Sequence, residues 1–183
     1  MKKYWWYNWK ANNNTNKLTI VLFVIYLIVL CWILLFKLGV RFSYMENRSI
    51  NLIPFREPLM RNGKIDLGET ILNVVIFAPM GIYAGILFRR LSFGNKIFFF
   101  FLMSFLIEGF QFIFKVGAFD ISDIITNMLG GIFGLMIFEI IERLFNNPVR
   151  SQIFINIISS IATLLMVSLL LLLKLNMLPV RYQ

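Results

Sequence analysis

The chain has 183 residues, of which 59% are hydrophobic and 16% aromatic, and its mean hydropathy is +0.77. A soluble domain of this length could not hide so much apolar side chain, because much of its surface must face water. The chain has no histidine and one cysteine, Cys31, which excludes an internal disulfide framework and argues against zinc hydrolases and histidine-based acyl transferases. Its net charge of +9 comes from basic residues that flank apolar segments and suit anionic lipid headgroups, so no nucleic-acid partner is expected.

The N-terminal part predicts an interfacial tail followed by a membrane-spanning helix. Residues 1–17 are basic and rich in asparagine and aromatic residues, which favour the membrane interface. Residues 18–38 form an apolar run that matches the ~20 residues needed to cross a bilayer. The run is too long for a signal-peptide core, and no small-residue cleavage site follows it. We therefore expect a retained helix.

A longer polar stretch, residues 39–69, follows this first span. It contains prolines and glycines, including Pro54 and Gly63, so it predicts a loop with a short interfacial segment rather than a straight helix. The loop also carries Arg48, Arg56 and Arg61.

Four further apolar runs predict four more membrane-spanning helices, at residues 70–88, 96–114, 121–141 and 153–175. The fold class predicted is therefore all-α, a polytopic bundle of about five helices with a structured loop between the first and second. Short connections make successive helices antiparallel. The expected organisation is a tail over 1–17, a membrane domain over 18–145, and a last helix with a short tail over 146–183.

Small residues and prolines indicate how the helices pack. Gly81 and Gly85, like Gly130 and Gly134, are spaced four apart, which allows close helix contact. Pro79 is tolerated in a membrane helix as a kink.

Six polar residues interrupt the apolar runs where a charge costs about 2.5–3.5 kcal/mol on the insertion scale. They are Asn73, Glu108, Gln111, Asp120, Asp123 and Asn127. Helical spacing puts Glu108 and Gln111 on one face, and the last three of these residues on another. Topology brings the start of the second span, the end of the third and the start of the fourth to one side of the membrane, under the loop. The sequence thus predicts a polar, water-accessible pocket there, completed by Arg48, Asn51 and Arg56.

Alternatives remain for these residues. Asp120 and Asp123 fall where a helix N-terminus favours acids. Asn73 and Asn127 suit interhelical hydrogen bonds, commonly worth ~0.6 kcal/mol each. Glu108 lies well inside an apolar run without a basic neighbour in sequence, which favours a function or a buried partner.

The basic residues bear on orientation. With the N-terminus inside, nine lie on the cytoplasmic side, and nine on the other if the long loop is counted. Because the positive-inside rule weighs short connections and helix ends, we discount the loop, which leaves nine against three. We therefore expect a cytoplasmic N-terminus and an outward-facing pocket.

Four segments carry a resemblance to the VanZ family, and they occur in that family's order. They are residues 49–55, which include Pro54 and Phe55, and residues 73–81, 108–111 and 119–130. The resemblance covers about Leu18 to Arg143, with the last helix resembling the family's variable end more loosely. It implies a small multi-pass protein of the bacterial cytoplasmic membrane. The family's founding member confers low-level resistance to teicoplanin, a glycopeptide with a lipid tail.

Three functions remain open. The first is a non-enzymatic envelope protein whose polar pocket binds a lipidated glycopeptide or a lipid-linked cell-wall precursor, with membrane lipids as its surroundings and no cofactor. The second is an enzyme acting on a phosphorylated or polyprenyl-linked lipid, in which paired acids hold Mg²⁺ and Arg48 or Arg56 clamps the anion. The third is a structural partner subunit. No metal-ligand spacing appears in the sequence, and catalytic residues are not assigned.

Overall fold

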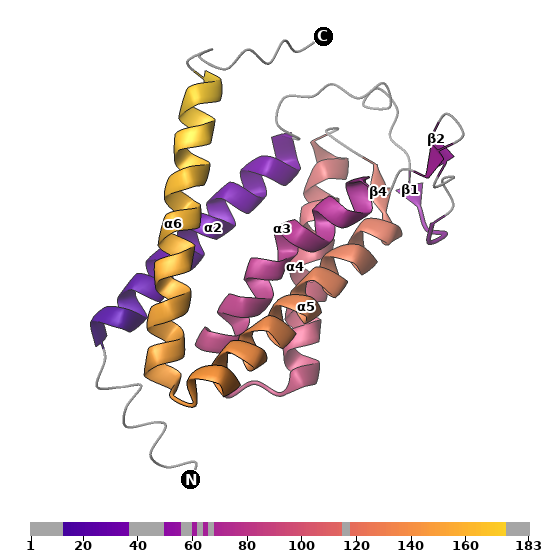
Figure 1. Ribbon diagram of the computed structural model, residues 1–183. Coiled ribbons are helices and arrows are strands. Elements are labelled where there is room, and N and C mark those ends of the chain that lie inside the picture. Colours follow the sequence, from indigo (N-terminus) through magenta and orange to yellow (C-terminus); the bar gives the residue numbers. More distant parts are fainter. Residues whose placement is uncertain are drawn as a thin grey trace. The chain divides into compact units, whose positions relative to one another are not determined.

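The computed structural model describes residues 13–36, 50–55, 60–61, 64–65, 68–114 and 118–174. These contain long helices and short strands (Figure 1). The helices are α2 (Asn13–Phe36), α3 (Gly68–Leu87), α4 (Phe93–Ile113), α5 (Ile121–Phe145) and α6 (Pro148–Lys174). The strands are β1 (Ile50–Asn51), β2 (Met60–Arg61), β3 (Lys64–Ile65) and β4 (Phe119–Asp120). Within the described residues, 5 helices are long and apolar enough to cross a membrane. The predicted fold class, an all-α multi-pass membrane protein, is confirmed.

Apolar runs become helices here because hydrocarbon offers no partner for a backbone N–H or C=O, so each segment must satisfy its own. The helix ends differ from the sequence prediction in one instructive place. The first helix begins at Asn13, whereas the sequence predicted a tail up to residue 17. Asn16 in this extra turn and Thr19 just after it are buried against α6, so their polar side chains support the helix rather than end it.

The chain forms two compact units. Unit 1 comprises Met1–Val29 and Ile141–Gln183, which include most of α2, the end of α5, and α6. Unit 2, Leu30–Ile140, contains α3, α4, most of α5 and all four described strands.

Glycines set the packing of α3 on α5 in unit 2. A Cβ on Gly81 would collide with the carbonyl oxygen of Gly131 and lie 2.7 Å from the backbone nitrogen of Leu135. One on Gly134 would collide with the carbonyl oxygen of Ala78. From one contact to the next, the residue numbers increase along both helices, so α3 and α5 run parallel. Their backbones are in direct contact. Only residues without a Cβ permit this approach.

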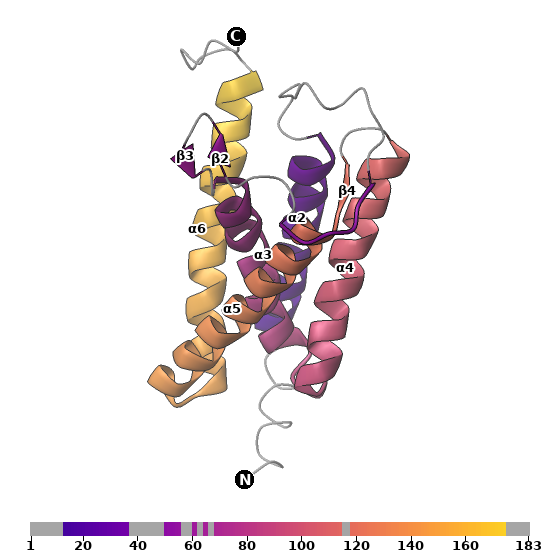
Figure 2. The ribbon, with the colours of Figure 1, turned by 90° about the vertical axis from the view of Figure 1, so that its right-hand side faces the viewer.

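Helix α4 packs antiparallel to α5. The ring of Phe100 fills the space above Gly131, and further along Ser104 lies beside Asn127. Phe77, Met80 and Phe100 are fully buried in this unit. Figure 2, turned by 90° from Figure 1, shows α4 and α5 near each other toward β4 and apart at their other ends.

In unit 1, α2 and α6 run parallel, because Asn16 bonds to Gln152 and, one turn later, Thr19 bonds to Asn156. A short connection at residues 146–147 joins α5 to α6. Asn146 adopts a left-handed φ of 49°, a conformation that asparagine tolerates better than most residues. The side chain of Asn147 then caps α6 by accepting the N–H of Val149 at 2.9 Å.

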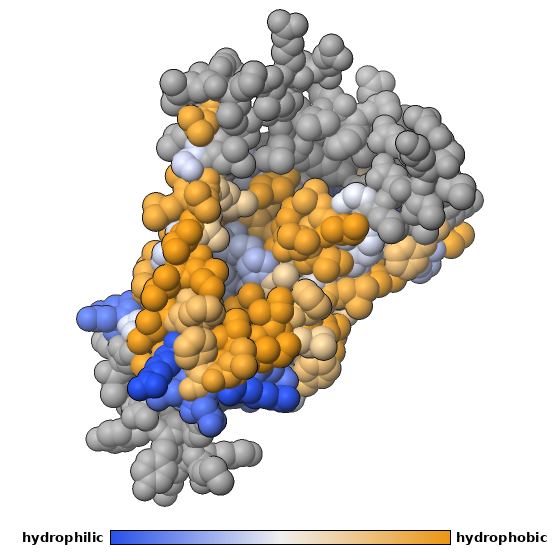
Figure 3. Space-filling model, viewed as in Figure 1, coloured by the Kyte–Doolittle hydropathy of each residue, from blue (hydrophilic) through white to orange (hydrophobic). Residues whose placement is uncertain are grey.

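Large apolar side chains are exposed along the helices, among them Leu164 at 70% and Leu165 at 65%. Figure 3 shows apolar residues along the visible surface of α6 and the most hydrophilic residues at the end where α5 joins α6. A surface of this kind is unfavourable in water and suits lipid, as the hydropathy predicts.

Candidate functional site: a polar cluster at one end of unit 2

The polar residues of unit 2 gather where α3 begins, α4 ends and α5 begins. Because α3 and α5 are parallel and α4 runs the other way, these three points lie at the same end of the unit. We call the following set the polar cluster: Asn51, Asn73, Glu108, Gln111, Asp120, Asp123 and Asn127. Hydrogen bonds join most of its members to one another or to the backbone beside them.

The loop before α3 reaches the cluster through a short parallel strand pair. In the register of β1 with β4, Ile50 lies opposite Phe119 and Asn51 opposite Asp120. The amide of Asn51 also donates to Oδ2 of Asp120 at 3.1 Å. This pairing fastens the loop to the start of α5, across a sequence separation of 69 residues.

The same loop makes a second contact at Phe55. Its N–H donates to the hydroxyl of Ser122 at 2.9 Å. Phe55 has a φ of 56°, a left-handed backbone conformation that is unfavourable for a bulky residue. Pro54 precedes it in the turn and fixes its own φ. Strain of this kind persists only where neighbouring contacts hold it, and the Ser122 hydroxyl is one such contact.

Asp120 differs from its sequence prediction. The i, i+3, i+7 spacing put it on one helical face with Asp123 and Asn127, whereas α5 begins only at Ile121. Asp120 lies in β4, and its Oδ1 accepts the N–H of Ser122 at 2.7 Å. It therefore caps the helix, because a carboxylate satisfies an N–H that has no partner within the first turn.

The two members of the polar cluster within α5 contact different helices. Asn73 on α3 donates to Oδ1 of Asp123 at 2.8 Å and is itself only 6% exposed. The amide of Asn127, by contrast, donates to the hydroxyl of Ser104 on α4 at 2.9 Å. Asp123 and Asn127 thus tie α5 to its two neighbours in unit 2.

Glu108 is the most buried carboxylate of the cluster, with 2% of its surface exposed. Its Oε2 accepts the backbone N–H of Asp120 at 3.3 Å, which links the end of α4 to β4. Gln111 is buried one turn further along α4. A buried acid at this depth costs free energy unless polar groups surround it, and the cluster supplies them.

Asn127 has one unsatisfied atom. Its carboxamide oxygen is buried, and no described residue donates a hydrogen bond to it. Buried polar atoms in folded proteins nearly always have a partner, so an acceptor of this kind suits a water molecule or a donor group on a ligand.

The other residues that the sequence singled out are not members of the polar cluster. Arg48 and Arg56 lie outside the described residues, so the predicted basic cover of the cluster stays a prediction. Pro79 lies inside α3, and Gly81, Gly130 and Gly134 lie at the α3–α5 contact. In the described ranges, no three His, Cys, Asp or Glu side chains are grouped to hold a metal ion.

The sequence did not reveal the serine hydroxyls that bond to Asn127 and to the N–H of Phe55, or a second set of buried polar residues in unit 1. Ser104 and Ser122 look unremarkable in sequence, because small hydroxyls are common in membrane helices and nothing marks the bond each makes. In unit 1, buried amides and a hydroxyl join α2 to α6, and they belong to Asn16, Thr19, Gln152 and Asn156. The spacing of three between Asn16 and Thr19, and of four between Gln152 and Asn156, is the signal that could have revealed this set.

The part of the chain that contains this cluster is similar to known proteins. The VanZ/LLP1 family model matches residues 23–142, a range that includes every member of the polar cluster. Protein VanZ of Enterococcus faecium is 36% identical over 138 residues, which cover 73% of this chain and 81% of that protein. No solved structure matches the chain.

Proposed function

Since this chain belongs to the VanZ/LLP1 family, we propose that it lowers the susceptibility of a bacterial envelope to teicoplanin-type lipoglycopeptides. The family match carries this proposal, together with the membrane-spanning helices that would keep the protein where such drugs act. In this function the protein binds a lipidated glycopeptide or a lipid-linked cell-wall precursor and is not itself an enzyme.

The polar cluster is the ligand site in this proposal. Asn51, Asp120 and Asp123 are partly exposed, whereas Glu108 and Asn127 are buried beneath them. A ligand rich in amide and hydroxyl donors would find carboxylate acceptors at the rim and the open oxygen of Asn127 below. Its lipid part would stay beside the apolar helix surfaces.

Expression in a susceptible Gram-positive host tests the function. We expect the inhibitory concentration of teicoplanin to rise more than that of vancomycin, which lacks the lipid tail. Membrane abundance, measured with a C-terminal fluorescent fusion, serves as the control. Normal abundance with no selective change in teicoplanin tolerance would refute the proposal.

Asn127 variants test the site. Asn127→Asp keeps the shape and an acceptor oxygen, whereas Asn127→Leu removes every polar atom. We expect both variants to reach the membrane and only Asn127→Leu to lose tolerance. Tolerance that survives in Asn127→Leu at normal abundance would exclude this residue from the ligand site.

A structural role is the second candidate, and the hydrogen bonds within the cluster favour it. The Asn73–Asp123 and Asn127–Ser104 pairs join helices whether or not a ligand binds. If Asp123→Asn and Asn127→Ala deplete the protein from the membrane, the cluster is architectural. If abundance holds and tolerance is lost, the cluster is a site.

The proposed orientation has the N-terminus inside and the polar cluster facing out. In a background with Cys31→Ser, a cysteine at Ile53 samples the loop at the start of α3, and one at Ser92 samples the opposite end of that helix. We expect an impermeant thiol reagent to label Ile53→Cys in intact cells and Ser92→Cys only after permeabilisation. The reverse pattern would invert the orientation.

A further inference from the structure

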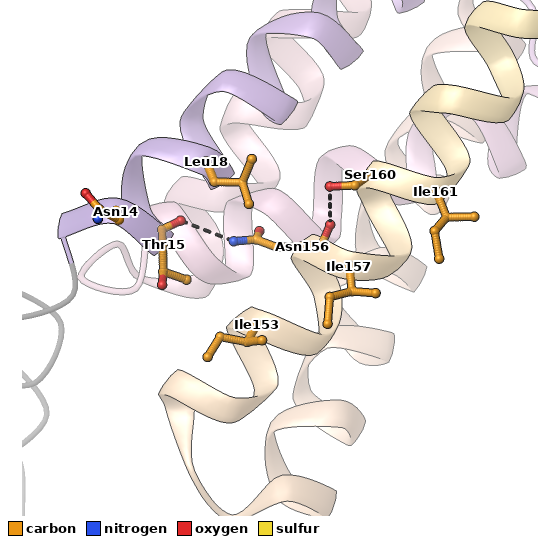
Figure 4. Close-up of a pocket in the computed structure, with 8 residues that line it drawn as sticks. All are labelled: Asn14, Thr15, Leu18, Ile153, Asn156, Ile157, Ser160 and Ile161. Carbon is orange, nitrogen blue, oxygen red and sulfur yellow. Dashed lines mark hydrogen bonds between the residues drawn. The ribbon is translucent and has the colours of Figure 1, made fainter.

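A groove lies in unit 1 between the starts of α2 and α6, apart from the polar cluster. Its volume is about 430 Å³, within the range of about 300–1,000 Å³ typical of small-molecule sites. Figure 4 shows its lining, which comes from both helices: Asn14, Thr15, Leu18, Ile153, Asn156, Ile157, Ser160 and Ile161.

The polar floor of the groove is fixed by its own hydrogen bonds. Asn156 donates to the carbonyl of Thr15 at 3.1 Å and accepts the hydroxyl of Thr19 at 2.9 Å. Behind it, Gln152 donates to Asn16 and to Thr19, each at 2.9 Å. Because these buried groups satisfy one another, they hold the two helices at a set spacing, and the groove between them is a built feature.

The walls of the groove are apolar and accessible. Ile153, Ile157 and Ile161 recur every four residues along α6 and form one stripe. Their exposed fractions are 42%, 54% and 54%, and Leu18 opposite them is 44% exposed. In membrane-spanning helices such a wall faces hydrocarbon chains, so it suits an acyl chain lying along α6.

A basic residue lies just beyond the groove lining, in the first turn of α6. Arg150 is exposed one turn before Ile153, and helical spacing puts it on the same stripe. The first turns of α2 and α6 contain no acid. The positive end of the α6 dipole adds to the charge of Arg150. This end therefore complements an anion placed at the level of the lipid headgroups.

We propose that the α2–α6 groove binds one anionic phospholipid. An acyl chain lies against Leu18 and the isoleucine stripe, and the headgroup phosphate lies at Arg150. Charge complementarity favours this occupant over a neutral lipid, and the exposed isoleucines favour it over a soluble anion. The proposal is independent of the polar cluster and of teicoplanin tolerance.

Native mass spectrometry of the full chain released from detergent tests the site. We expect phosphatidylglycerol to bind as a 1:1 adduct that survives activation, and phosphatidylcholine to bind more weakly. Arg150→Gln removes the cation and is expected to weaken phosphatidylglycerol binding about fivefold, since one basic residue near an anionic lipid surface contributes about that much. Ile157→Trp fills the groove and is expected to reduce the adduct further.

Two matched variants control the test. Lys17→Gln removes an exposed cation of α2 that, like Arg150, does not line the groove but that lies off the isoleucine stripe of α6, and Ile158→Trp enlarges the neighbouring exposed isoleucine. Both are expected to bind phosphatidylglycerol like the parent chain. Thermal melting of all variants checks folding; if Ile157→Trp fails to fold, the comparison of Arg150→Gln with Lys17→Gln decides.

Three results would overturn the proposal. The first is equal binding of the two lipids. The second is equal weakening by Arg150→Gln and Lys17→Gln, which would indicate a nonspecific lipid shell. The third is a lipid-free dimer that Ile157→Trp dissociates, which would make the groove a contact between two copies of the chain.

Discussion

Gly134→Ala probes the tightest backbone approach that an added Cβ would meet at any glycine of the described helices. The added Cβ would collide with the carbonyl oxygen of Ala78 and lie 2.8 Å from its carbonyl carbon and 3.0 Å from the Cα of Gly81. All three atoms belong to the backbone, so no side chain can rotate away and α3 must move from α5. Overpacking of this kind costs about 1–3 kcal/mol, against a gain of about 1 kcal/mol from replacing a helical glycine with alanine.

The matched control is Gly109→Ala on α4, where nothing lies within 4 Å of an added Cβ. Here only the gain of up to about 1 kcal/mol applies. The two variants carry the same chemical change and are expected to shift stability in opposite directions. At about 2–4 °C per kcal/mol for a chain of this size, their melting temperatures should differ by several degrees.

Thermal unfolding of the purified chain in detergent, followed by tryptophan fluorescence and by loss of the monodisperse peak in size-exclusion chromatography, measures this difference. Gly134→Ala is expected to melt below the parent and Gly109→Ala at or above it. If Gly134→Ala melts no lower than Gly109→Ala, the α3–α5 contact does not have the tightness described above.

Two further sets of variants test hydrogen bonds in the polar cluster and in the turn beside it. Asn73→Leu and Asp123→Leu are each expected to lower the melting temperature. The double variant is expected to lose less stability than the sum of the two single losses, with a coupling energy of about 0.6 kcal/mol. If the two losses simply add, the 2.8 Å bond between these residues contributes nothing to stability. Ser122→Ala removes the acceptor of the Phe55 N–H, so hydrogen exchange at that amide is expected to speed up while global stability changes by less than about 0.5 kcal/mol. Unchanged exchange at Phe55 would mean that other contacts hold the turn.

The sequence predicted the fold class because composition and the length of the apolar runs depend on local chain properties alone. It also picked out the residues of the polar cluster, since a carboxylate or amide is conspicuous in an apolar helix. It did not predict their partners. The bond between Asn127 and Ser104 depends on how α4 and α5 are rotated, which side-chain packing decides.

Two other features had no usable sequence signal. A strand of two residues such as β1 is too short to show alternation, so its pairing with β4 follows only from the fold. The start of α2 at Asn13 was missed because asparagine and lysine at a helix end look like a solvated tail. The burial of Asn16 depends on Gln152, more than a hundred residues away.

That separation has a consequence for biogenesis. The side chains of Asn16 and Thr19 are synthesised long before their partners on α6. Helix α2 therefore enters the membrane before these two side chains can form their hydrogen bonds to α6. Until the last helix leaves the insertion machinery, water at the interface has to satisfy these groups. Pairing of α2 with α6 is thus a late assembly step, and it fastens the beginning of the chain to its last helix. A ribosome-bound chain stalled before Gln152 should accordingly be a better substrate for membrane proteases than one stalled after Lys174.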